Sequence, residues 1–209
     1  MIERVIKGPG CVAEGAAFLA ALDPRFGDAL QQSGPLPLRL KPDGFGSLLD
    51  AIVSQQVSVA AASAIWNRLE NAQLTTPTAI AAATDDQLRA CGLSRPKQRY
   101  ARALADARLD YAGLRDTSSE QVIETLVALP GIGPWTAEIY AMFSLGRADV
   151  FAPGDLALQE AARQLFDLPD RPSEKQLREM SAAWQPWRSV AARLLWAYYR
   201  VIKQREGTR

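Results

Sequence analysis

The sequence predicts an all-α fold, and three observations lead to it. Apolar residues recur at a helical period along most of the 209 residues, and strand-like alternation is confined to a possible short piece at residues 1–6. Gly- and Pro-rich segments divide the chain into pieces of helix length, joined by short connections. With 48% hydrophobic residues, the chain is long enough to bury one or two cores.

The breaks between helices fall where Gly and Pro gather, at residues 33–46, 92–96, 129–134, 146–154 and 167–173. Between and around these breaks the apolar periodicity predicts a series of helices. They span approximately residues 12–21, 45–56, 58–70, 76–81, 85–90, 96–107, 119–128, 134–145, 155–166, 173–183 and 187–204. No internal repeat is found in this series.

The composition excludes several classes of chemistry. The chain has no histidine, so Ser-His-Asp, Cys-His and histidine–metal sites are excluded, and acid–base chemistry must come from Asp, Glu, Lys, Tyr or Cys. Its two cysteines cannot form a four-cysteine zinc or iron–sulfur site. No apolar run approaches the ~20 residues that a membrane span requires, and no signal peptide is recognisable. These features predict a reducing, intracellular compartment.

Charge is unevenly distributed in a chain whose net charge is only +1. Residues 89–108 hold six basic residues and one acid, and the segment after Pro186 holds six basic residues and only Glu206 as an acid. Two such stretches can form a one-sided surface for binding anions. They can equally be two ordinary solvated faces, and charge alone does not decide between these interpretations.

Two glutamines lie at a predicted junction between helices. The apolar stripe of the predicted helix 45–56 continues to Gln56, and Ser58 suits the N-cap of the following helix. Gln55 and Gln56 are therefore placed where one helix gives way to the next. Either they cap neighbouring backbone groups, or Gln56 points into something other than the core.

A tryptophan on the last predicted helix falls on the wrong side for a core residue. Tyr198 belongs to the apolar face of helix 187–204, whereas Trp196 lies about 180° away, among Arg193 and Arg200. Two interpretations fit this position. The indole is buried against a second layer of structure, or it stacks on the π-face of a ligand.

The sequence LPGIGPWTA at residues 129–137 joins two predicted helices through a short loop with two glycines. Pro134 suits the first turn of the second helix, where its missing N–H costs nothing. The glycines permit positive φ and leave no Cβ over the loop, so backbone N–H groups at the helix start can meet an anion such as a phosphate. A tight turn between two helices, without any ligand, is the alternative.

A second loop, from Gly146 to Gly154, ends in the sequence VFAPGD, and Asp155 then opens a helix. A carboxylate is common at an N-cap for structural reasons alone. Asp155, however, follows Gly133 by 22 residues, and the combination of hairpin, Gly/Pro loop and carboxylate is specific.

In these features the chain resembles the helix–hairpin–helix (HhH-GPD) DNA glycosylase superfamily, and within it the alkyladenine (3-methyladenine) DNA glycosylase II branch. The resemblance rests on five blocks in the family's order, AIVSQQVSVAAASAIWNRL at 51–69, GLSRPKQRYARALA at 92–105, LPGIGPWTAEIYAMF at 129–143, DVFAPGDLALQ at 149–159 and WQPWRSVAARLLW at 184–196. Some family members carry an additional N-terminal β-rich domain, for which residues 1–43 are too few.

The resemblance implies a role for each matching residue. Asp155 would be the catalytic carboxylate, at the mouth of a cleft between two helical lobes. Gln56 would fill the gap left by an extruded nucleotide. The base pocket would be lined by Trp135, Trp196, Ile139, Tyr140 and Gln55. The DNA backbone would be gripped by Gly131, Ile132, Gly133 and Thr136. A monovalent cation, Na⁺ or K⁺, would bind the backbone of Val127, Leu129 and Ile132.

A second phosphate contact is predicted from the residues themselves. Ser94 and Lys97 stand at the start of the predicted helix 96–107, although an ordinary solvated helix N-terminus would look the same. Arg188 is expected to pack and orient the last helix rather than to take part in catalysis.

Two departures from the family pattern carry information. Branches that also cut the DNA strand have a lysine two residues after the last glycine of the hairpin, and this chain has Trp135 there. Without that amine no Schiff base forms by the usual route, so no AP-lyase activity is expected. Some relatives have a pocket tyrosine where Ile139 stands, with Tyr140 beside it, which leaves the lining of the pocket open.

The sequence therefore predicts a monofunctional DNA glycosylase that hydrolyses the N-glycosidic bond of flipped-out alkylated purines of the 3-methyladenine and 7-methylguanine type. The alternatives are a non-catalytic helix–hairpin–helix DNA-binding protein and a glycosylase for deaminated or etheno bases. The expected domains are residues 44–147, and residues 1–43 with 148–209. We expect no cofactor beyond the hairpin cation, double-stranded damaged DNA as partner, no membrane association or obligate protein partner, a monomer, and a bacterial-type cytoplasmic, nucleoid-associated location.

Overall fold

The computed structural model describes residues 3–207, and the side chains of residues 3–204. Met1 and Ile2, which belong to the predicted strand, lie outside this description. The side chains of residues 205–209, in the second basic stretch, lie outside it too. Within it the chain is helical, and the only strand-like feature is a single antiparallel bridge between Val5 and Arg147. The all-α prediction is confirmed, and a strand at residues 3–6 does not form because only this one bridge pairs with it.

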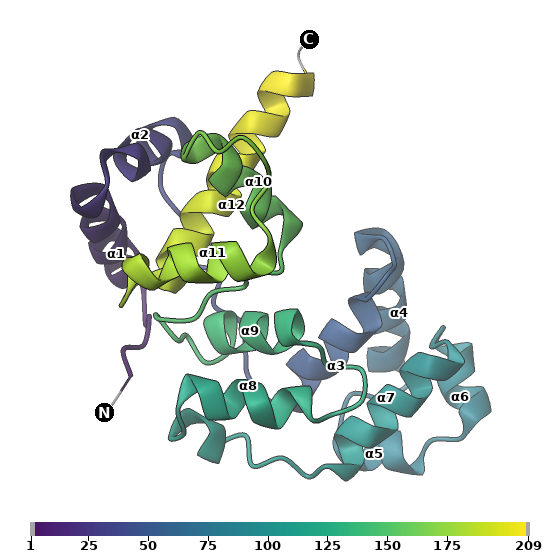
Figure 1. The fold of residues 1–209 in the computed structure, drawn as a ribbon. Coiled ribbons are helices and arrows are strands. Elements are labelled where there is room, and N and C mark those ends of the chain that lie inside the picture. The colour runs from purple at the N-terminus through teal and green to yellow at the C-terminus, as the bar shows by residue number, and fades with distance from the viewer. Residues whose placement is uncertain (1–2, 208–209) are drawn as a thin grey trace. The chain divides into compact units, whose positions relative to one another are not determined.

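The helices belong to two compact units. Unit 1 comprises Met1–Leu40 and Ala141–Arg209, and unit 2 comprises Lys41–Tyr140. Unit 1 is thus built from both ends of the chain, whereas unit 2 is continuous. Figure 1 follows the chain through the helices of each unit.

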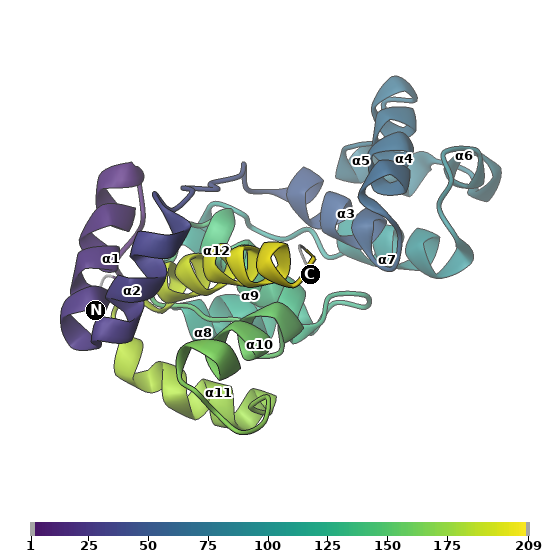
Figure 2. The same cartoon turned by 90° about the horizontal axis from the view of Figure 1, so that it is seen from above.

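Unit 1 is organised around its last helix, α12. Figures 1 and 2 show this helix in yellow, and α1, α2 and α10 all pack against it. The helices of this unit are α1 (Pro9–Leu22), α2 (Pro24–Ser33), the end of α9 (Pro134–Phe143), α10 (Leu156–Leu165), α11 (Glu174–Ser181), the short 3₁₀ turn η2 (Ala182–Trp184) and α12 (Arg188–Gly207). An aromatic cluster fills the space between them, with Trp184 at ring-centre distances of 5.3–5.8 Å from Phe26, Phe151 and Phe166.

Helix α2 is absent from the predicted series of helices. The start signal was nevertheless present in the sequence. Asp23 caps the helix through its carboxylate, which accepts the N–H of Arg25 at 2.9 Å, and Pro24 occupies the first turn. Phe26 is fully buried and fixes the inner face of the helix.

Unit 2 packs its helices around α7. This helix contacts α3, α5 and α6, and its inner face buries Ala101, Leu104 and Ala105. The helices of this unit are α3 (Phe45–Ser54), α4 (Val59–Asn71), α5 (Pro77–Ala82), α6 (Asp85–Ala90), α7 (Arg95–Asp106), the 3₁₀ turn η1 (Gly113–Arg115), α8 (Ser119–Val127) and most of α9.

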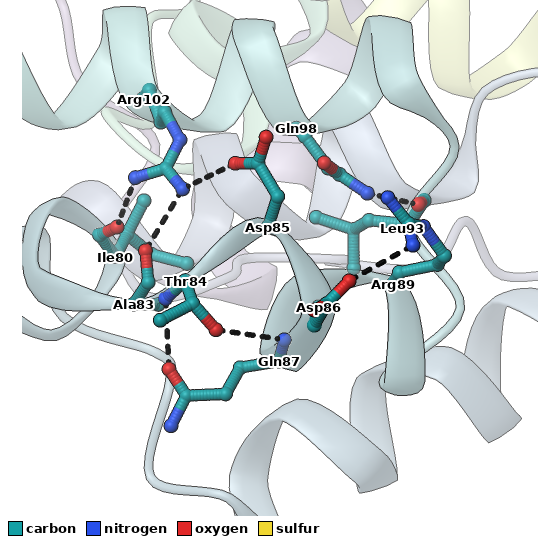
Figure 3. Close-up of polar contacts among 10 residues, drawn as sticks. All are labelled: Ile80, Ala83, Thr84, Asp85, Asp86, Gln87, Arg89, Leu93, Gln98 and Arg102. Atoms are coloured by element: carbon teal, nitrogen blue, oxygen red, sulfur yellow. Dashed lines mark hydrogen bonds and ion pairs between the residues drawn. The ribbon is translucent and has the colours of Figure 1, made fainter.

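Part of the first basic stretch is used to hold unit 2 together. Figure 3 shows Arg102 of α7 donating to the carbonyls of Ile80 and Ala83 and to the carboxylate of Asp85, at 3.3, 2.8 and 2.8 Å. The same guanidinium therefore joins the end of α5 to the start of α6. Arg89 pairs with Asp86 at 2.9 Å. These two arginines have internal partners, so the stretch is less basic toward solvent than the sequence indicates.

Helix ends differ from the predicted ones by a few residues, and one difference matters. The helix predicted to include Gln56 ends at Ser54, since Gln56 takes the left-handed conformation with φ 56°. Gln56 therefore does not continue the apolar stripe. No helix in the described part of the chain is long and apolar enough to cross a membrane.

Candidate functional site

Asp155 lies directly before α10 and caps it. Its Oδ1 accepts the backbone N–H of Ala157 at 2.9 Å and that of Leu158 at 3.1 Å. The side chain is half-buried. Two backbone donors fix the orientation of the carboxylate, and the aligned amide dipoles of the helix stabilise negative charge at this end.

The loop that carries Asp155 is tied down by side chains from two helices. Arg188, at the start of α12, binds both carboxylate oxygens of Asp149 at 2.7 and 3.0 Å and its carbonyl at 2.9 Å. Gln159 of α10 donates to the carbonyl of Pro153 at 2.8 Å. Arg188, which was expected to pack and orient the last helix, thus joins the start of α12 to the loop that leads to Asp155.

Trp196 is half-buried and packs on an aromatic partner that the sequence did not single out. Its ring centre lies 5.8 Å from that of Phe143, with the planes tilted by 34°. Burial against a second layer is therefore found in part, and stacking on a ligand stays a prediction for the surface that Trp196 keeps exposed.

Arg193 departs from its expected place on a basic outer face, since only 1% of it is exposed. Its guanidinium lies over the ring of Phe143, 4.6 Å from the centre, and donates to the carbonyls of Ser189 and Leu38. Burial, followed by the nearby charge of Arg39, lowers the pKa of Arg193 to about 10. The helical wheel failed here because the segment that covers Arg193 comes from 155 residues earlier in the chain.

The two glycines of the hairpin loop have different reasons to be glycine. Gly131 has φ 88°, and a Cβ there would lie 2.3 Å from Cγ of Tyr100. Gly133 does not have a positive φ, and a Cβ there would meet nothing within 4 Å. Both glycines permit positive φ, and only Gly131 adopts it. Gly133 leaves bare backbone facing open space at the start of α9.

The glutamine junction connects to this hairpin. Nε2 of Gln55 donates to the carbonyl of Gly131 at 2.8 Å. Ser58 caps α4, with its hydroxyl accepting the N–H of Ala61 at 3.2 Å, which confirms the predicted junction. Gln56 is exposed between these two anchors, followed by Val57 and Val59, which are 39% and 85% exposed. Gln56 thus stands at an exposed tip of the chain, and the bonds of Gln55 and Ser58 on either side hold this tip in place.

The predicted second phosphate contact lies at the start of α7. Nζ of Lys97 donates to the carbonyl of Val53 at 2.6 Å, and burial lowers the pKa of this amine. Ser94 is the N-cap residue, but its hydroxyl makes no capping bond. In the hairpin itself, Ile132 and Thr136 are buried, so their side chains face the protein.

The predicted pocket residues of α9 differ in exposure. Trp135 is 47% exposed, Ile139 is half-buried and Tyr140 is buried. The phenol oxygen of Tyr140 accepts the N–H of Gly44 at 2.9 Å, and burial raises the pKa of this phenol. The hydroxyl of Tyr140 thus serves the packing of unit 2.

The structure places the predicted residues in both units. Asp155 and Trp196 belong to unit 1, and Trp135, with the hairpin and the glutamine junction, belongs to unit 2. Sequence reasoning missed Phe143, although it ends one of the quoted blocks. The signal available for it was an aromatic residue eight positions after Trp135 on the same helix.

Among the described residues, no group of three His, Cys, Asp or Glu side chains could hold a metal ion. The predicted cation at the hairpin would use backbone carbonyls instead. That of Leu129 accepts the N–H of Ile132 at 3.1 Å and keeps a second lone pair.

Comparison with known proteins agrees with this geometry. Residues 49–188 match the model of the HhH-GPD superfamily base excision DNA repair proteins. DNA-3-methyladenine glycosylase 1 of Schizosaccharomyces pombe is 35% identical over 167 residues, which cover 75% of this chain and 72% of the relative. DNA-3-methyladenine glycosylase 2 of Escherichia coli is 31% identical over 168 residues, 74% of this chain and 57% of the relative.

Solved structures are similar over nearly the whole chain. A DNA-3-methyladenine glycosidase from Bacillus halodurans has a TM-score of 0.82 and 34% identity, covering 98% of this chain and 95% of that one. The S. pombe 3-methyladenine DNA glycosylase Mag1, in complex with abasic DNA, has a TM-score of 0.74 and 32% identity, covering 88% of this chain and 95% of that one. This chain therefore belongs to the HhH-GPD superfamily of base excision DNA repair proteins.

Proposed function

We propose that this protein removes purines alkylated at N3 or N7 from double-stranded DNA, and leaves the strand itself intact. It is a DNA glycosylase, a hydrolase of the N-glycosyl bond, as its family and its relatives named 3-methyladenine glycosylases establish. The observation that carries the finer proposal is Asp155, a carboxylate oriented by two backbone N–H groups in a loop that Arg188 ties down.

The chemistry requires stabilisation of positive charge. As the bond between base and sugar breaks, its electron pair leaves with the base and the deoxyribose gains oxocarbenium character. The carboxylate of Asp155 stabilises this charge and accepts a proton from the water that attacks the anomeric carbon. The products are the free base and an abasic site.

Binding follows from the hairpin and the glutamine junction. The bare backbone around Gly133, at the start of α9, suits a DNA phosphate, a contact that carries no sequence information. Gln56, exposed at its tip, fills the gap left when the damaged nucleotide is extruded, at a cost of a few kcal/mol that is smaller for a damaged pair. The indoles of Trp135 and Trp196 then offer π-faces to the base.

Two further parts of the proposal depend on the hairpin and its surroundings. Trp135 stands where strand-cutting relatives have an amine, so the abasic product is not cleaved. A Na⁺ or K⁺ ion held by the carbonyls of Val127, Leu129 and Ile132 would supply positive charge to a DNA phosphate. We also propose that the protein acts as a monomer, in the cytoplasm and on the nucleoid.

Duplexes that each carry one lesion, incubated with the protein and then treated with alkali, test the proposal. Asp155→Asn should bind DNA as before and lose at least a hundredfold in excision rate. Asp170→Asn, an exposed acid in the following loop, should leave excision unchanged and is the matched control. Retained excision by Asp155→Asn would remove this residue from the mechanism. Release of no base from any lesion would favour the non-catalytic DNA-binding alternative, and strand breaks without alkali would contradict the absence of lyase activity.

A further inference from the structure

Unit 1 contains a buried positive charge next to Trp196. Arg193 is 1% exposed and lies against Phe143, the same ring on which Trp196 packs. It is held there by backbone carbonyls and by the hydroxyl of Ser189. Neutral oxygens satisfy its N–H groups without cancelling its charge.

Two more arginines add to this charge. Burial lowers the pKa of both Arg193 and Arg39, and a neighbouring charge adds to each shift, that of Arg39 to the first and that of Arg200 to the second. The three cations are therefore close enough to interact. In the described part of the chain, neither Asp nor Glu forms an ion pair with any of the three. No ion pair of the described residues therefore cancels the charge of Arg193 beside Phe143, and burial keeps water from screening it.

We propose that Arg193 is a specificity-determining residue that works against cationic bases and in favour of neutral ones at Trp196. This inference rests on the proposed function, in which Trp196 lines the base pocket. A purine methylated at N7 or N3 enters as a cation and leaves as a neutral base. A neutral base, such as 1,N6-ethenoadenine or hypoxanthine, enters uncharged and leaves with developing negative charge.

At every point of the reaction the two kinds of base differ by one unit of charge. The field of Arg193 therefore affects the ratio of cationic to neutral base release at every stage. Arg193 and Trp196 both contact Phe143, which places the guanidinium and the indole within about 10 Å of each other. At that separation and an effective dielectric constant of about 20, the charge of Arg193 changes the ratio of cationic to neutral base release roughly tenfold. This repulsion opposes the cation–π attraction that the indoles offer to alkylated purines.

The test measures kcat/KM for base release from duplexes with a single 7-methylguanine, 1,N6-ethenoadenine or hypoxanthine. Arg193→Met removes the charge and keeps much of the length, and should raise the ratio of cationic to neutral base release roughly tenfold. Arg193→Lys restores a charge at that position and should keep the wild-type ratio. Arg178→Met, which removes an exposed arginine of the same unit, should also leave the ratio unchanged.

Each outcome decides the matter. An equal fall in kcat/KM for all three bases in Arg193→Met would mean that Arg193 is only structural, and would overturn the inference. If Arg193→Met does not fold, the exposed pair Arg39→Gln and Arg200→Gln replaces it, with an expected rise of twofold to threefold, and an unchanged ratio in that double variant also overturns it. If the wild-type protein releases none of the three bases, the proposed function fails instead.

Discussion

The loop before Asp155 and the hairpin loop are both short connections that lead into a helix, but they are held in different ways. Residues 146–154 are fixed by charged and polar side chains, chiefly the pair of Arg188 with Asp149 and the bond from Gln159 to Pro153. Residues 129–133 are fixed through the backbone, by the packing of Tyr100 against Gly131 and by the amide of Gln55.

The difference fits what each loop presents. The first presents one side chain, Asp155, whose oxygen atoms, in the proposed function, must be placed accurately against a reacting sugar. The second presents backbone N–H groups, which any side chain above Gly133 would cover. Side chains from elsewhere hold both loops. They grip the first partly through its own carboxylate, that of Asp149, and the second at Gly131, where the loop has no side chain.

The largest effect on stability is expected from Gly131→Ala. The new Cβ would meet Tyr100 at 2.3 Å, and alanine is strained at φ 88°, so the free energy of unfolding should fall by about 3 kcal/mol. Gly133→Ala is the matched control, since its Cβ has room, and should change stability by about 0.5 kcal/mol or less. Thermal unfolding of both variants measures this. The proposed phosphate contact adds that Gly133→Ala weakens DNA binding, and equal melting temperatures for the two variants would contradict the comparison.

A smaller effect is expected from Arg188→Met, which leaves Asp149 without its partner. Both side chains of this pair are about three-quarters buried, at 26% and 29% exposed, so the loss should be about 1–2 kcal/mol. Excision should fall as well, because the loop before Asp155 loosens. Arg178→Met breaks the pair with Glu174, whose side chains are 53% and 55% exposed, and should cost at most about 0.5 kcal/mol. Equal melting temperatures and equal excision rates for Arg188→Met and Arg178→Met would contradict the expected difference between the two ion pairs.

The smallest effects should separate the two neighbouring glutamines. Gln55→Ala removes the bond to the Gly131 carbonyl and should lower stability by about 1 kcal/mol. Gln56→Gly relieves a residue at φ 56° and should raise stability by up to about 1 kcal/mol. The same Gln56→Gly change should slow excision if Gln56 fills the gap in the duplex. Unfolding and single-turnover excision of both variants measure the two effects, and a stabilising Gln55→Ala would show that the hairpin needs no such anchor.

Much of the helical layout could be read from the sequence, because its helices begin with strong local signals. Ser58, Thr84, Ser118 and Ser173 all cap helices that were predicted to start at or next to them. Local signals also explain the failures. The capping residue Asp23 was overlooked, and the left-handed residue Gln56 is neither Gly nor Asn, the residues that usually mark such a turn.

The environment of Trp196 shows what local patterns leave out. Trp196 keeps exposed surface, but Ser189 and Arg193, which the helical period places on the same side, are buried. The catalytic role of Asp155 stays a prediction from its spacing and from the family resemblance. The burial of Arg193 depends on Leu38 from the other end of unit 1, and its contact with Phe143 depends on a helix fifty residues earlier. Such contacts between distant segments follow only from the assembled fold, so charge patterns along one helix cannot reveal them.

The division of the chain also bears on its synthesis. The hundred residues of unit 2, Lys41–Tyr140, emerge from the ribosome as one uninterrupted segment, while unit 1 must wait for α12, the helix around which it is organised. Because domains generally fold as units during translation, α1 and α2 can pack against each other early, but the faces that they turn to α12 stay uncovered until that helix has been made. During that interval the apolar faces of the first two helices are the part of the nascent chain most exposed to aggregation or to a chaperone.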